Sequence, residues 1–102
     1  MVVFPTPVPR LDIIEAAGTA IVEGSGPVVL TLPFGSSGDR TVVVQATDFN
    51  SVIDIAVVLT PDNGDSVMYE AEIDNLSTNP AETTVNISLP VNVQTNINAW
   101  TR

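Results

Sequence analysis

The chain contains no cysteine and no histidine. Without cysteine the fold has no disulfide bond, no thiol nucleophile and no thiolate ligand for a metal ion. Without histidine the sequence excludes a Ser-His dyad and the common zinc sites. No glycine-rich phosphate loop precedes a helix, so nothing indicates nucleotide binding. These absences predict that the protein is not an enzyme and carries no cofactor.

Paired carboxylates are the one catalytic arrangement that needs neither histidine nor cysteine. Glu70 and Glu72 stand two residues apart on one face of a predicted strand. A hydrolase of that type surrounds one of its carboxyl groups with apolar side chains. The predicted face is solvated, so we interpret both residues as surface side chains.

Basic residues are scarce. The chain has three arginines, no lysine and twelve acidic residues, which gives a net charge of −9. Binding to nucleic acid or to an anionic membrane needs a basic patch, and three arginines do not make one. Apolar runs fall short of the ~18 residues that span a bilayer, and residues 1–9 show no signal-peptide pattern. We therefore expect no nucleic-acid partner and no membrane insertion.

Polar and apolar residues alternate in run after run, with turn residues between the runs. This period of two is typical of strands with one buried face, and turns every 8–12 residues are typical of a sandwich. The sequence predicts one all-β domain, an antiparallel β-sandwich of about six to eight strands over residues 18–102. Four runs alternate most clearly: Ile53–Thr60, Ser66–Asp74, Thr83–Leu89 and Thr95–Thr101.

The alternation also predicts the core and one turn. Asn63-Gly64 predicts a tight hairpin, because this pair accepts the positive φ that such turns demand. Seven side chains are expected in the core: Ile55, Val57, Leu59, Tyr69, Ile73, Val85 and Ile87.

Residues 1–17 form a separate segment in this interpretation, an apolar N-terminal arm or edge strand. Pro5, Pro7 and Pro9 favour an extended backbone and exclude a helix. So much apolar surface at a terminus needs cover. Either the arm lies along its own sandwich, or it pairs with another copy by strand complementation. The expected interface residues are Val3, Phe4, Val8, Leu11, Ile13 and, near the other end of the chain, Trp100.

The stretch from Thr83 to Trp100 reads Thr-Thr-Val-Asn-Ile-Ser-Leu-Pro and then, after a turn, Thr-Asn-Ile-Asn-Ala-Trp. It resembles strands E and F of fibronectin type III and other immunoglobulin-like modules. Thr41–Thr47 and Ile53–Thr60 are similar to strands B and C. The resemblance implies an immunoglobulin-like sandwich.

Two features depart from that family. The tyrosine of the tyrosine corner is absent, and the sequence stops at Arg102, where the family continues into strand G. Two strand counts remain open. Either the sandwich lacks its last strand, or a count that starts at Thr19 makes the fold complete.

Acidic turn residues are the candidates for a metal site. Calcium takes six to eight oxygen ligands, and the loops of a sandwich gather at its two ends. One end would collect Asp48 and Asp74, and the other Asp62 and Asp65. Turns also favour Asp and Asn for their own conformation, so we predict no metal site.

The leading hypothesis is a structural or assembly protein that acts through protein–protein contacts, such as a surface, extracellular filament or virion subunit. Its partner would be itself, as a homo-oligomer or fibre, or other surface proteins, at an extracellular or particle surface. The alternative is a calcium- or carbohydrate-binding adhesion module. A sugar platform needs several exposed aromatics, and only Phe4, Phe34 and Trp100 lie outside the predicted core pattern.

Overall fold

The computed structural model describes residues 9–22, 27–74, 78 and 80–102. This part of the chain forms eight strands and no helix, so the all-β prediction is confirmed. Consequently, it holds no helix with the length and apolar character to cross a membrane. The strands are β1 (Arg10–Ala16), β2 (Thr19–Ala20), β3 (Val28–Leu30), β4 (Asp39–Thr47), β5 (Ile53–Pro61), β6 (Val67–Ile73), β7 (Ala81–Ser88) and β8 (Thr95–Thr101).

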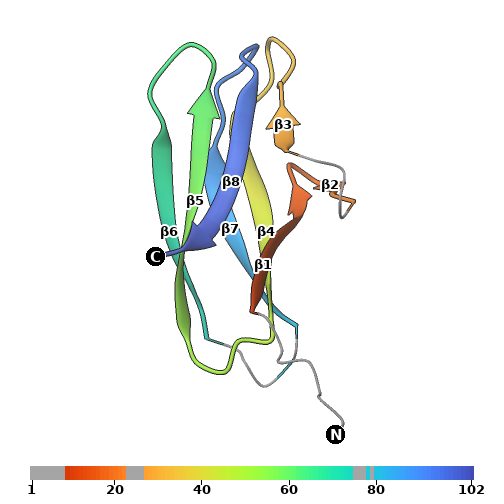
Figure 1. The fold of residues 1–102 in the computed structure, drawn as a ribbon. Helices are drawn as coiled ribbons and strands as arrows, with labels where there is room; N and C mark the ends of the chain where they lie inside the picture. Colours follow the sequence, from red (N-terminus) through yellow and green to blue (C-terminus); the bar gives the residue numbers. More distant parts are fainter. Residues whose placement is uncertain (1–8, 23–26, 75–77, 79) are drawn as a thin grey trace, which may run out of the picture.

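The strands build two four-stranded sheets that pack face to face (Figure 1). The first sheet has the order β2-β1-β4-β7 and the second has the order β3-β8-β5-β6. Every neighbouring pair of strands is antiparallel. The predicted antiparallel β-sandwich is therefore confirmed.

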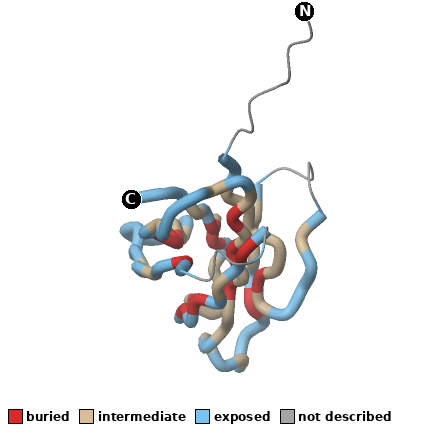
Figure 2. Tube along the Cα trace, turned by 90° about the horizontal axis from the view of Figure 1, so that it is seen from below, coloured by how far each residue is buried: buried red, intermediate tan, exposed pale blue. Residues whose placement is uncertain are grey.

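The core lies between the sheets, and Figure 2 colours red the stretches of the chain whose residues are buried there. The alternation of β4 buries Val42, Val44 and Ala46 there, because every second side chain of a strand faces the same way. Of the seven expected core residues, six are buried and Tyr69 is half-buried. The six are Ile55, Val57, Leu59, Ile73, Val85 and Ile87.

The second sheet departs from the simple pattern of inner and outer faces. Ala56 and Val58, predicted on the outer face of β5, are nevertheless buried. β5 has a neighbour on each side, and the larger Trp100 and Met68 stand directly opposite these two residues. Val67 stands two residues before Tyr69, so the alternation predicts that it faces the core, but it is exposed because it opens β6 beside the hairpin loop.

The β5–β6 hairpin exists as predicted, but its turn is of another kind. Neither Asn63 nor Gly64 has a positive φ. The connection is longer than two residues, since the last strand pair is Leu59 with Val67, and a longer loop does not need a mirror-image turn. The hydroxyls of Thr60 and Ser66 share a hydrogen bond of 3.0 Å across its base.

β1 lies inside the first sheet. It pairs with β4 along its whole length, from Arg10 with Thr47 to Ala16 with Val42, and with β2 only at Glu15 and Ala16. The register shifts between Ile13 and Glu15, which is a β-bulge. Among the described residues, therefore, the second side of β1 is bonded only near its end, by β2 and by the N–H of Ile21, which donates to the carbonyl of Ile14.

Candidate protein interaction site

One lateral side of the sandwich is bridged by a side chain. Here β6 and β7 are the outer strands of their sheets. Tyr69 of β6 packs against the core, and its hydroxyl accepts a hydrogen bond of 3.1 Å from the backbone N–H of Ser88 in β7. This bond explains why Tyr69 is only half-buried. It also joins the two sheet edges and occupies one edge donor of β7.

The opposite lateral side is open, and backbone hydrogen bonds show which groups of β8 face it. Arg102 N–H donates to Asp54 C=O and Asp62 N–H donates to Gln94 C=O, both at 2.9 Å. Successive residues of an antiparallel strand point their N–H and C=O groups to alternate sides. The even-numbered residues of β8 therefore bond to β5, and its odd-numbered residues face the outer edge.

At that outer edge β3 covers only half of β8. Leu30 and Val28 stand opposite Thr95 and Ile97. No described strand pairs with Ala99 or Thr101 on this side. Among the described residues, nothing pairs with their N–H and C=O groups, which we call the free edge of β8; such an edge is a template for another strand.

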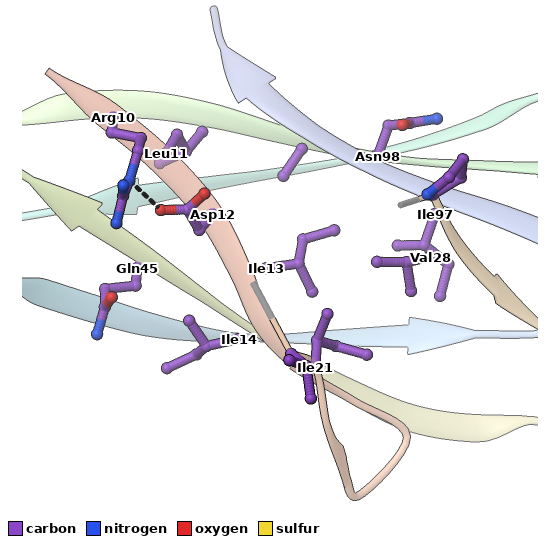
Figure 3. Close-up of a pocket in the computed structure, with 13 residues that line it drawn as sticks. Arg10, Leu11, Asp12, Ile13, Ile14, Ile21, Val28, Gln45, Ile97 and Asn98 are labelled. Atoms are coloured by element: carbon purple, nitrogen blue, oxygen red, sulfur yellow. Dashed lines mark hydrogen bonds and ion pairs between the residues drawn. The ribbon is translucent and has the colours of Figure 1, made fainter. Parts of the chain in front are cut away.

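A groove of about 270 Å³ lies beside this free edge, between β1 and β8. Figure 3 shows Ile13 of β1, Val28 of β3 and Ile97 of β8 gathered in it, with Ile21 below them. Ile97 is buried, and the other three are half-buried against the core. The volume is below the ~300–1,000 Å³ typical of small-molecule pockets, so a few side chains of a partner suit it better.

The groove carries little net charge. Its one arginine, Arg10, donates from Nε to Oδ2 of Asp12 at 2.7 Å, and no other charged side chain among the described residues lines it. Both members of this pair stand at the start of β1 (Figure 3). On a chain with a net charge of −9, the described lining is locally balanced in charge and mixes polar side chains with apolar ones.

Comparisons of the chain with models of known families, with curated proteins and with solved structures found no match. The interaction site therefore rests on geometry alone.

The structure brings two of the predicted interface residues together. Leu11 and Ile13 both line the groove. Trp100 does not: it stands on the outer face of the second sheet, 49% exposed, opposite Ala56. Val3, Phe4 and Val8 lie outside the described residues.

The acidic candidates are dispersed. Asp48, Asp74, Asp62 and Asp65 are all exposed, in the loops at the two ends of the sandwich. Among the described residues, no three acidic side chains are grouped so that they could hold a metal ion. Glu70 and Glu72 are exposed on β6, and Glu70 Oε1 lies 3.0 Å from the guanidinium of Arg102.

Sequence reasoning missed half of the groove. Ile21, Val28, Ile97 and Ala99 line it together with β1, although they come from distant parts of the chain. One feature of the sequence indicated an uncovered strand edge. The apolar run between Pro27 and Pro33 is too short to pair with the whole of a seven-residue strand such as β8.

Proposed function

We propose that the protein is a structural or assembly subunit, and that it contacts other protein molecules along the open side of the sandwich. One observation carries the proposal: the stretch of β8 from Ala99 to Thr101, which no described strand covers, begins at a groove whose floor holds the apolar side chains of Ile13, Val28 and Ile97. Main-chain hydrogen bonds to an added strand would supply affinity, and the groove would accept its alternate side chains.

The difference between the two lateral sides supports a specific contact. An open edge is an aggregation hazard that proteins usually cover or charge. In this molecule Tyr69 ties the β6–β7 side together. Within the described residues the β8 edge has no such contact, and it carries no charged side chain at Ala99 or Thr101. A sheet edge that no side chain of the other sheet bridges is consistent with use as a contact.

The immunoglobulin-like assignment belongs to this proposal. It is supported by the neighbours β4–β7 and β5–β8, which correspond to the B–E and C–F pairs of that fold. In this correspondence β3 stands where strand G would lie beside strand F. The acidic, lysine-free composition suits a subunit at a cell or particle surface.

The first test is the molar mass of the full chain over a wide range of concentrations, by light scattering or sedimentation. We expect the mass to rise above the 10.7 kDa of one chain as the concentration increases. A single monomeric species up to millimolar concentration would overturn the proposal.

A pair of proline variants then locates the contact. Ala99→Pro removes an N–H from the free edge of β8 and leaves the β5–β8 hydrogen bonds in place. Met68→Pro is its match, because the same alternation points the Met68 N–H to the free edge of β6. We expect Ala99→Pro to weaken association by roughly tenfold or more and Met68→Pro to leave it unchanged. The reverse pattern would place the contact on the β6–β7 side.

A further inference from the structure

We propose that the strand that fills the open side is the N-terminal segment of a second copy of this chain, residues 1–8, added antiparallel to β8. This inference rests on the proposed function and names its partner. Three features support it: the pattern of prolines in the segment, the arrangement of β3 and the length of the segment before β1.

The prolines leave this segment with one hydrogen-bonding edge. In an extended strand, residues of one parity direct their N–H groups to one side and residues of the other parity to the opposite side. Pro5, Pro7 and Pro9 all have odd numbers, so every missing donor falls on the same side. The even-numbered side keeps each of its N–H groups. Such a strand can add to a sheet edge and cannot be extended by a further strand.

The same parity sets the side chains that would enter the groove. In an antiparallel pair, residues that exchange hydrogen bonds stand opposite each other with their side chains on one face. Ile97, and the half-buried Ala99 two residues on, face inward. The even-numbered residues of the added segment would form hydrogen bonds with the free edge of β8. Their side chains would therefore also point inward. They are Val2, Phe4, Thr6 and Val8.

β3 already shows this arrangement over three residues. Val28 and Leu30 pair antiparallel with Ile97 and Thr95, and both are half-buried, while Val29 between them is 41% exposed. A strand added beyond Val28 in the same direction would cover Ala99 and Thr101. It would extend to the end of β8 the pattern that β3 begins.

The length of the segment also fits. Eight extended residues span about 26 Å, and the uncovered stretch Asn98–Thr101 needs about 13 Å, at roughly 3.3 Å per residue. About four residues are left to connect the two molecules. A chain that filled its own groove would have to reverse direction at Pro9, directly before Arg10, which is already paired with Thr47. No glycine precedes Gly18 to help such a reversal.

The test uses full-length chains with one substitution each. Phe4→Asp places a charge on the face predicted to enter the groove, and Val3→Asp places the same charge on the opposite face. We expect Phe4→Asp to weaken self-association at least tenfold and Val3→Asp to leave it close to that of the unchanged chain, measured by sedimentation. Equal effects of the two substitutions would overturn the proposed pairing.

Mixing two defective variants decides whether the segment acts between molecules. Phe4→Asp keeps an open β8 edge, and Ala99→Pro keeps an intact N-terminal segment. Each alone should be monomeric, and an equimolar mixture should form a dimer that does not grow further. A mixture that stays monomeric would overturn the proposal.

The outcomes separate the two proposals. If the unchanged chain never associates, the proposed function fails, and this inference fails with it. If the chain associates and Ala99→Pro abolishes association but Phe4→Asp does not, the open edge is the contact and the N-terminal segment is not its occupant.

Discussion

Tyr69 illustrates how one side chain can serve two surfaces. Its ring packs against the core from β6, while its hydroxyl reaches the edge of the other sheet at Ser88. Apolar core residues such as Ile73 have no polar group with which to do this. At the scale of single residues, apolar side chains fill the core, whereas the amphipathic side chain of Tyr69 both packs against the core and bonds to the edge of the other sheet.

The fully buried residues should dominate stability. Ile55 in β5 is 0% exposed and Ile87 in β7 is 4% exposed, so they fill the core from both sheets. We expect Ile55→Ala and Ile87→Ala each to lower the free energy of unfolding by about 2–5 kcal/mol, from lost burial and the cavity left behind. Urea denaturation measures this, with Thr84→Ala on the exposed face of β7 as the control. Losses below about 0.5 kcal/mol at both isoleucines would contradict the assignment of faces.

At the scale of elements, the contact between β4 and β7 depends on a glycine. Gly38 precedes β4, and its carbonyl accepts a hydrogen bond of 2.9 Å from the N–H of Leu89, which extends the ladder past β7. A Cβ at Gly38 would lie 2.5 Å from the carbonyl oxygen of Leu89, and this atom belongs to a backbone that cannot easily move. The close approach therefore requires glycine.

We expect Gly38→Ala to destabilise the fold by roughly 1–3 kcal/mol, because the strands would have to separate locally. Gly64→Ala is the matched control: its Cβ would meet nothing closer than 3.9 Å, and its φ is not positive. That variant should be neutral or slightly stabilising. Thermal melts of the two variants, compared with the unchanged chain, provide the measurement. Equal melting temperatures would show that the β4–β7 contact tolerates a side chain.

Alternation predicted the long strands well, and the reason is local. The predicted run Thr95–Thr101 coincides with β8, and Ile53–Thr60 differs from β5 by one residue. Each residue in such a run shows by its polarity which face it occupies. The six buried core residues followed directly from that rule.

The pairing of strands could not be predicted in the same way. The apolar run Val28–Leu32 between Pro27 and Pro33 favours a strand of five residues, whereas β3 ends at Leu30 and Leu32 makes only an isolated bridge to Val91. Nothing in the sequence indicated that β3 would pair with β8 rather than with a nearer strand. The groove depends on that long-range pairing, and so its walls could be found only in three dimensions.

Net charge acts at the scale of the whole molecule. Two copies of a −9 chain repel each other, and salt screens this repulsion within about 10 Å at 0.1 M. The contact proposed here is made by backbone hydrogen bonds and apolar side chains, so it should gain from screening. We expect self-association to be stronger at 0.5 M than at 0.02 M sodium chloride, measured by light scattering at fixed protein concentration. Dissociation by salt would indicate a contact made by ion pairs.

The bond between Tyr69 and Ser88 makes the two lateral sides of the molecule different. If association uses the β8 edge alone, each molecule offers one acceptor edge, and its N-terminal segment would be one donor. Units with a valence of two cannot branch. Their assembly would be a ring or a single-file chain whose two ends differ, one with a free donor and one with an empty acceptor. Such a chain has a direction, and subunits could join each end at a different rate.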